Sequence, residues 1–288
     1  MRRKGIQFLL GMGLFLLPYA GHAESIFAPA GPVAEGERMI LLDSVAIMLA
    51  IVVPTLMAIA AFAWWFRAGN ARARRLPNWA YSGQVELLVW SVPALVVMFL
   101  GGIAWIGSHA LDPAKPIASQ MAPLEVQVVS LDWRWLFIYP AQHMASMNRL
   151  VTPVGMPVHA HITSATVMNV FFIPRIASEI YAMNGMETQL NFEADRPGTY
   201  PGLSAHFSGD GFSDMAFNLD AVSPAQFATW VKTAQATGPL LDEPAYRALL
   251  KQSHDTSAYT YRDVAPGLFD AVVMQHLPPG DGPLQASN

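Results

Sequence analysis

The stretch Gly202–Met215, which reads GLSAHFSGDGFSDM, has the residue spacing of a metal-binding loop. Ser204 and Ser208 are four residues apart, Phe212 follows after four more, and Met215 comes three residues later. Soft transition metals bind thiolate, imidazole or thioether groups, and neither serine nor phenylalanine provides one. The pattern therefore predicts a loop with the shape of a copper site that has lost its copper, with Met215 as a core residue.

Histidines offer two other candidate metal sites. His159 and His161 alternate with apolar residues, so both could chelate a metal from one face of a strand. No third ligand lies nearby in sequence, and we interpret the pair as surface residues. A mononuclear copper site built from His206 and Met215 would need a cysteine, and the chain contains none. We therefore expect no metal to be bound by this chain.

The composition indicates a membrane protein. Of the 288 residues, 53% are hydrophobic and only 13% are charged, about half the charged fraction of a soluble domain. The formal net charge of −4 gives no basic field that would attract nucleic acid. Without cysteine the chain can form no disulfide, thiolate metal site or cysteine nucleophile.

The N-terminal residues 1–23 have the organisation of a bacterial signal peptide. Arg2, Arg3 and Lys4 precede a short apolar run, and small residues lead up to Ala23. The apolar run is shorter than the ~20 residues that span a bilayer. We expect cleavage after Ala23, with an uncleaved anchor as the alternative. Residues 24–38 then form a short external segment.

Two apolar segments, 39–66 and 85–107, are each long enough to cross the membrane. The loop between them, 67–84, contains Arg67, Arg72, Arg74 and Arg75 and no acidic residue. Such basic clusters mark cytoplasmic loops. The sequence therefore predicts a two-helix hairpin in a bacterial inner membrane, with both the N-terminus and the C-terminal bulk of the chain in the periplasm.

Residues 114–222 carry the pattern of an all-β sandwich or barrel. Short segments of alternating polarity are separated by turn signals such as Arg196-Pro197-Gly198, without long helices between them. Residues 223–277 favour short helices at Ala225–Ala234, Glu243–Gln252 and Phe269–Leu277. These helices could pack on the β domain or on a partner, and the sequence leaves both open. The Pro/Gly/Ser-rich residues 278–288 are expected to form a flexible tail.

The order of these parts resembles subunit II of the haem–copper oxidases. VELLVWSVPALVV (85–97) resembles the second helix of the family, and LDWRWLFIYP (131–140) looks like the aromatic strand of the quinol-oxidising branch. VMNVFFIPRIASEIYAMNGM (167–186) and the 202–215 loop look like the two segments that supply copper ligands in the cytochrome c branch. The resemblance covers about residues 35 to 275 and implies a cupredoxin-like β domain.

The resemblance also assigns the former ligand positions. In the copper-bearing branch the loop reads Cys-x-Glu-x-Cys-x-x-x-His-x-x-Met, and a second histidine comes from the earlier strand. The two cysteines fall on Ser204 and Ser208, the loop histidine on Phe212 and the strand histidine on Asn169. Met215 alone matches. These departures point to the quinol-oxidising branch, whose subunit II resembles a cupredoxin without copper.

The function that the resemblance implies is that of a supporting subunit in a respiratory ubiquinol oxidase. Such a complex oxidises ubiquinol, reduces O2 to water and translocates protons. The chain itself would bind no cofactor, and the haems and copper would reside in subunit I. Its partners would be subunits I, III and IV and membrane lipid. Ubiquinol would bind to the complex as a whole rather than to this chain, and cytochrome c would not be a partner. The alternatives are a membrane-anchored cupredoxin-like electron carrier and a structural scaffold outside an oxidase.

Three further residues are candidates through this resemblance. Trp133 and Trp135 are expected on one face of a strand, where a cytochrome c oxidase takes in electrons; without copper, we predict a packing or subunit-contact role. Glu86 stands at the cytoplasmic end of the second span, where a carboxylate is functional by default. In the family, this position meets the entrance of a proton pathway of subunit I. The alternative is a glutamate that extends to interfacial water.

Overall fold

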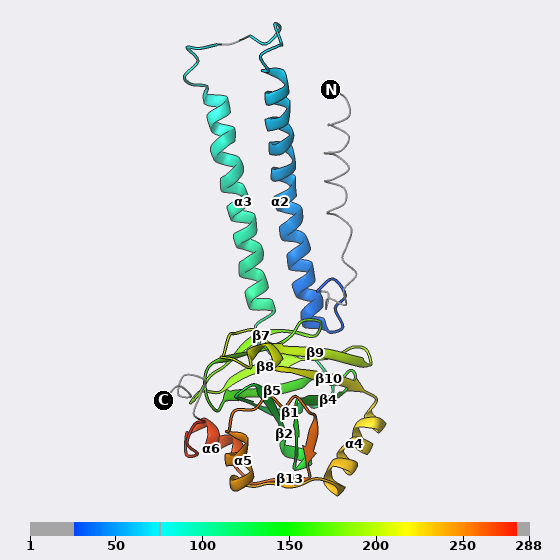
Figure 1. The fold of residues 1–288 in the computed structure, drawn as a ribbon. Helices are drawn as coiled ribbons and strands as arrows, with labels where there is room; N and C mark the ends of the chain where they lie inside the picture. The colour runs from blue at the N-terminus through cyan, green and yellow to red at the C-terminus, as the bar shows by residue number, and fades with distance from the viewer. Residues whose placement is uncertain (1–25, 75, 281–288) are drawn as a thin grey trace, which may run out of the picture.

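The structure, a computed structural model, describes residues 26–74 and 76–280. Two long helices rise from one side of a β domain, and the C-terminal helices lie at the far end of that domain (Figure 1). This architecture confirms the predicted membrane hairpin followed by an all-β domain with short C-terminal helices. The predicted signal peptide, 1–23, and residues 281–288 of the predicted tail lie outside the described residues.

The hairpin consists of α2 (Pro32–Trp65) and α3 (Gly83–Ala110). Both helices are long and apolar enough to cross a membrane, and the most apolar stretch of each has no residue buried within the described chain. α2 begins at Pro32, well before the apolar run at Met39, because proline is favoured in the first turn of a helix. The polar first turns of α2 therefore extend the helix beyond the apolar segment towards the β domain.

The two helices approach each other most closely next to the β domain. A Cβ atom on Gly107 would lie 2.6 Å from Cδ1 of Ile40, and one on Gly36 would lie 2.8 Å from Cδ2 of Leu111. Small residues allow helices to pack at short range in a membrane, where burial of apolar surface gives no driving force. Gly107 is also buried, which is consistent with this close packing.

The start of α2 is fixed to the β domain by backbone hydrogen bonds. Ala30 donates to the carbonyl of Arg175 (2.7 Å) and accepts from the amide of Asp195 (2.8 Å). The guanidinium of Arg175 donates to the carbonyl of Ala28 (2.8 Å). Gly31 leaves no room for a side chain, since a Cβ atom there would lie 2.2 Å from the carbonyl oxygen of Glu193. The orientation of the hairpin is thus set by the domain.

Two sheets form the β domain. The first has the order β12-β3-β2-β1-β5-β8, and the second has the order β4-β10-β9-β6-β7. The strands of the first sheet are β1 (Leu124–Leu131), β2 (Arg134–Tyr139), β3 (Met144–Met147), β5 (Val158–Ser164), β8 (Thr188–Phe192) and β12 (Tyr259–Tyr261). Those of the second are β4 (Arg149–Pro153), β6 (Asn169–Ile173), β7 (Ala177–Ala182), β9 (Gly198–Ser204) and β10 (Ala216–Val222). Most neighbouring strands are antiparallel, but β1 pairs with β5 and β10 with β4 in parallel.

The main core lies between the two sheets. Alternate residues of each strand point inwards, so that Val126, Val128 and Trp135 of the first sheet meet Phe171 and Phe217 of the second. All five side chains are buried. The predicted alternation of strand residues is therefore the pattern that builds this core.

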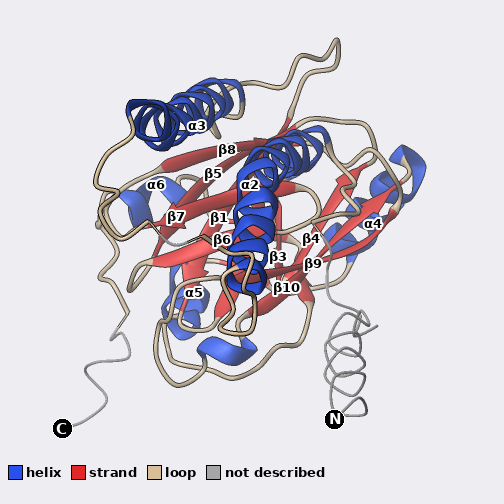
Figure 2. Ribbon diagram, turned by 90° about the horizontal axis from the view of Figure 1, so that it is seen from above, coloured by secondary structure: helices blue, strands red, loops and turns tan. Residues whose placement is uncertain are grey.

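The C-terminal part packs on the chain itself. It contains α4 (Pro224–Ala236), α5 (Glu243–Leu249), α6 (Leu268–Val273) and the short strands β11 (Leu240–Leu241) and β13 (Asp263–Val264). Its apolar residues include Leu241, Tyr246, Leu249, Leu268, Phe269 and Val272, which form a second core with the outer face of the first sheet. In the view along the hairpin, α4 lies on the opposite side of the domain from α6 (Figure 2). The short C-terminal helices thus pack on the β domain of the same chain, and contact with a partner stays a prediction.

Tyr139 links the two sheets through a polar contact inside the core. Its hydroxyl donates to the carbonyl of Val151 (3.1 Å) and accepts from the amide of the same residue (2.8 Å). Tyr139 lies on β2 and Val151 on β4, and both are buried. Burial raises the pKa of Tyr139 well above its ordinary value, so the hydroxyl stays protonated and able to donate.

We expect Tyr139→Phe to lower the free energy of unfolding by about 1–3 kcal/mol, because it leaves the amide and carbonyl of Val151 unpaired inside the core. Denaturant unfolding of the full chain in detergent, followed by tryptophan fluorescence, measures the change. Tyr181→Phe is the matched control, since Tyr181 is 46% exposed, and should stay within about 0.5 kcal/mol. Equal effects of the two variants would contradict the role of Tyr139.

Candidate functional site

The end of β9 and the loop before β10 contain four of the five positions that the resemblance assigns to copper ligands, and β6 supplies the fifth, Asn169. β9 ends at Ser204, a 3-10 turn covers Phe212–Asp214, and β10 begins directly after Met215. Asn169 opens β6, which pairs with β9 so that Phe171 lies opposite Ser204. Sheet pairing therefore places a residue from β6 beside a loop that follows it much later in the chain.

Asn169 and Ser204 form one half of this site. The Ser204 hydroxyl donates to Oδ1 of Asn169 over 3.1 Å, and the amide group of Asn169 contacts the carbonyl of Val167 at 3.4 Å. The backbone amide of Ser204 donates to the carbonyl of Met215 over 3.1 Å, which closes the base of the loop. Asn169 and Ser204 are almost completely buried. Both polar side chains satisfy their hydrogen bonds within the protein.

Ser208 and Met215 form the other half. The hydroxyl of Ser208 lies 4.0 Å from the sulfur of Met215. Met215 is only 1% exposed and belongs to the main core, where the sequence predicted a core residue. Phe212 is half-buried, and its ring lies 5.7 Å from the ring of Phe207. The site therefore offers two hydroxyls, one amide, one thioether and one phenyl ring.

This set of side chains does not suit a dinuclear copper centre. Two copper ions that share electrons need bridging thiolates and imidazole ligands, and among these five positions only the thioether of Met215 is a soft ligand. The hydroxyls and the amide are hydrogen-bonded to protein atoms instead. The arrangement is that of a small buried polar cluster beneath a surface loop.

Trp133 supports the loop from below, but it does not lie in a strand as predicted. β1 and β2 are joined by a two-residue turn, Asp132-Trp133, in which Trp133 has a φ of +68°. Its indole donates to the carbonyl of Ser208 over 3.1 Å. Its ring lies 4.8 Å from that of His254, and a Cβ atom on Gly211 would lie 2.3 Å from the indole. Trp133 thus holds the loop against the C-terminal part.

Trp135 lies at the centre of the main core. Its ring meets those of Phe171 (5.3 Å) and Phe217 (5.7 Å) edge-on. Trp133 is 5% exposed and Trp135 is fully buried. Of the two predicted roles, packing agrees with this burial. The subunit-contact role stays a prediction.

Glu86 lies in the first turn of α3, at the end of the hairpin farthest from the β domain (Figure 1). Its side chain is exposed in the isolated chain, and its backbone amide donates to the carbonyl of Ser82 over 2.9 Å. The position is remote from the 202–215 loop. Glu86 and the loop therefore belong to different sites.

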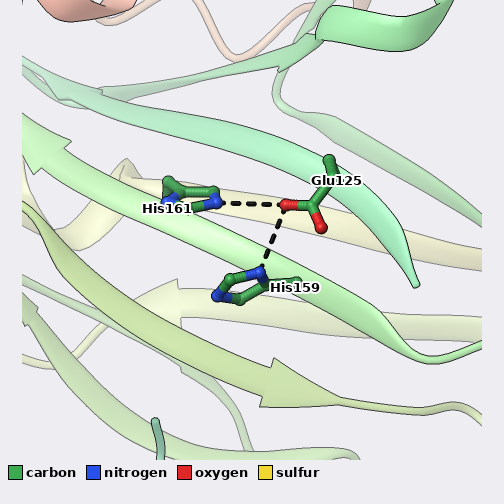
Figure 3. Close-up of side chains that lie close together, drawn as sticks. All are labelled: Glu125, His159 and His161. Atoms are coloured by element: carbon green, nitrogen blue, oxygen red, sulfur yellow. Dashed lines mark hydrogen bonds and ion pairs between the residues drawn. The ribbon is translucent and has the colours of Figure 1, made fainter. Parts of the chain in front are cut away.

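The structure also brings together a group that the sequence analysis missed. His159 and His161 do have a carboxylate neighbour: Glu125, from the adjacent parallel strand (Figure 3). The two segments are far apart in sequence, so the search for a third ligand near the histidines could not find it. The alternation of polar residues in both strands was the available signal, but the pairing of β1 with β5 was needed to use it.

Comparison with known proteins places the chain in a family. Residues 125–222 match the family model described as "Cytochrome C oxidase subunit II, periplasmic domain", and residues 235–280 match "COX Aromatic Rich Motif". The chain is 43% identical to ubiquinol oxidase subunit 2 of Acetobacter aceti over 259 residues, which cover 89% of this chain and 84% of the relative. It is 40% identical to cytochrome bo(3) ubiquinol oxidase subunit 2 of Pseudomonas aeruginosa over 257 residues, which cover 89% and 78% of the two chains.

A solved structure, the periplasmic domain of subunit II of cytochrome oxidase of Bradyrhizobium japonicum, is 23% identical with a TM-score of 0.39 and covers 41% of this chain and 98% of that one. The matched periplasmic-domain model agrees with the predicted cupredoxin-like sandwich. The chain is anchored in the membrane by two helices that precede this periplasmic domain. Because two relatives at 40% identity or more are matched over most of their length, the chain belongs to the family of subunit 2 of the cytochrome bo3-type ubiquinol oxidases, as the resemblance predicted.

Proposed function

We propose that this chain is a supporting subunit without a redox centre of its own, within a respiratory complex that oxidises ubiquinol, reduces O2 to water and translocates protons. The observation that carries the proposal is the set of side chains at positions 169, 204, 208, 212 and 215. Asn169 contacts Ser204, and Ser208 contacts Met215, at the positions that the resemblance assigns to copper ligands, and the five side chains supply neither thiolate nor imidazole.

The loss of these ligands matches the identity of the electron donor. A water-soluble cytochrome c delivers single electrons at the membrane surface and requires an external relay to pass them into the bilayer. Ubiquinol is lipid-soluble and reaches a membrane-embedded subunit directly. We therefore assign the haems and the catalytic copper to subunit I, and ubiquinol binding to the complex rather than to this chain.

The membrane hairpin supplies the surface for assembly. The apolar stretches of α2 and α3 are exposed along their length in the isolated chain, and such surfaces must face lipid or other membrane helices. We infer that one side of the hairpin packs on subunit I in a bacterial inner membrane, with subunits III and IV as further members of the complex. The periplasmic domain is fixed to this hairpin through Ala30 and Arg175.

We further infer that Glu86 contributes to proton uptake by the complex. It stands at the cytoplasmic end of α3, where protons enter from the cell interior. A carboxylate at the membrane boundary is suited to collect protons and pass them to a neighbouring pathway. The alternative is a glutamate that only extends to water, and substitution separates the two.

Two other functions remain as competing hypotheses. A membrane-anchored cupredoxin-like electron carrier would require a redox centre, and the residues at the ligand positions disfavour it. A structural scaffold outside an oxidase would share the fold, and the relatives named as oxidase subunits disfavour it. Co-purification of the tagged chain with haem absorbance distinguishes the scaffold from the proposed subunit.

Metal analysis tests the absence of a redox centre. We expect the full chain, purified in detergent and exposed to copper, to show no electron paramagnetic resonance signal of a thiolate-bridged copper pair. As a positive control, Asn169→His, Ser204→Cys, Ser208→Cys and Phe212→His together restore the missing side chains and should produce that signal. A bridged copper signal from the native chain would refute the proposal.

Donor preference tests the branch of the oxidase. We expect the purified complex to consume oxygen with ubiquinol as the donor and to remain inactive with reduced cytochrome c, because no relay at the periplasmic surface accepts its electrons. Oxygen electrode measurements with each donor decide the question. Turnover on cytochrome c without turnover on quinol would show that the assignment is wrong.

Substitution of Glu86 tests its role in proton uptake. Glu86→Gln should slow oxygen reduction and proton uptake, measured in vesicles that contain the complex, because the amide cannot carry a proton. Asp43→Asn is the matched control, since Asp43 is an exposed carboxylate near the opposite end of the hairpin. If both variants behave like the native complex, Glu86 only extends to interfacial water.

A further inference from the structure

Three ionisable side chains gather on the outer face of the first sheet, away from the 202–215 loop. Glu125 comes from β1, and His159 and His161 come from the neighbouring strand β5 (Figure 3). The strands are parallel, with Glu125 opposite His159. Residues two apart on a strand point to the same face, so the backbone register directs all three side chains to one place.

A single carboxylate oxygen stands between the two imidazoles. Oε2 of Glu125 lies 3.2 Å from Nδ1 of His159 and 3.0 Å from Nε2 of His161. The three ligand atoms all lie within 4.8 Å of one another. Ligand atoms around a tetrahedral Zn²⁺ ion are separated by about 3.3–3.6 Å, given metal–ligand distances of about 2.0–2.2 Å. The two nitrogen–oxygen distances are thus close to the spacing that the ion requires.

Glu187 fixes the second histidine from its other side. Oε1 of Glu187 lies 2.6 Å from Nδ1 of His161 and can accept a hydrogen bond from this nitrogen. The opposite nitrogen, Nε2, faces Oε2 of Glu125, so in the tautomer protonated at Nδ1 its lone pair is available to a cation held between the two side chains. A carboxylate hydrogen-bonded to the outer nitrogen of a metal-binding histidine is the usual way to orient such a ligand.

The segment that carries Glu187 is held in place by hydrogen bonds. The hydroxyl of Thr163 donates to the carbonyls of Met183 (3.1 Å) and Met186 (2.8 Å). The amide of Asn184 donates to the carbonyl of Ser164 over 3.1 Å. Thr163 and Ser164 follow the two histidines on β5, so these hydrogen bonds hold the segment before Glu187 against the strand that carries the histidines.

We propose that Glu125, His159 and His161 bind a Zn²⁺ ion, with Glu187 as the residue that orients His161. Two imidazole nitrogens and one carboxylate oxygen suit zinc, whereas Mg²⁺ and Ca²⁺ prefer oxygen ligands alone. The side chains of both histidines are about a quarter exposed and that of Glu125 is 43% exposed, so water can complete the coordination. Zinc has no redox chemistry, and the ion would join β1 to β5.

Zinc content of the purified oxidase complex tests this site. After treatment with a chelator and dialysis against micromolar Zn²⁺, the native complex should hold one more zinc ion than the double variant His159→Ala, His161→Ala, as measured by mass spectrometry. Glu125→Gln should behave like the double variant. Glu187→Gln should weaken zinc binding about 10–100-fold, as loss of an orienting partner does.

His276→Ala is the matched control, because His276 is an exposed histidine elsewhere on the chain, and it should leave the zinc content unchanged. X-ray absorption at the zinc edge of the native complex provides a second measurement and should show imidazole ligands with first distances of about 2.0–2.2 Å. Equal zinc content in the native complex and the double variant, or a zinc spectrum without imidazole, would overturn the proposal.

Discussion

The contact of three aromatic rings between the two sheets is the interaction on which the periplasmic domain depends. Phe171 and Phe217 stack at 4.9 Å with an angle of 11°, and Trp135 meets both edge-on. Such pairs contribute about 0.5–1.5 kcal/mol each beyond the burial of their surface. Gly202 completes the cluster, because a Cβ atom there would lie 2.1 Å from the ring of Phe217. The rings therefore fix the strands from which the 202–215 loop emerges.

The loop keeps its shape through contacts that need no metal. The amide of Ser204 donates to the carbonyl of Met215 and joins the two ends of the loop. Within the loop, the amide of Phe212 donates to the carbonyl of Gly209, and the indole of Trp133 donates to the carbonyl of Ser208. These contacts join backbone groups and an indole, so none of them depends on a thiolate or imidazole at positions 204, 208 or 212. They are compatible with the proposal that this loop works without copper.

The C-terminal part determines which surface of the first sheet remains accessible. It covers the outer face at Val129 and Leu131, towards the end of β1. Glu125 lies on the same face near the start of that strand and stays 43% exposed on its side chain. The C-terminal part therefore buries the end of β1 and leaves the side chain of Glu125, near the start of β1, accessible to solvent. Arg134 on β2 connects the C-terminal part to the sheet, because its guanidinium donates to the carbonyl of Leu249 over 2.8 Å.

The sequence alone determined the membrane hairpin, the class of the β domain and the unsuitability of Ser204 and Ser208 as copper ligands, because hydropathy, alternation and ligand chemistry are local properties. Only the tertiary structure decided the surroundings of the candidate residues. Trp133 was predicted in a strand but lies in a turn, because the chain reverses direction there. Glu125 lies beside the two histidines because β1 pairs with β5. Pairing between distant strands depends on the packing of the whole sandwich, and no local pattern in this chain specifies it.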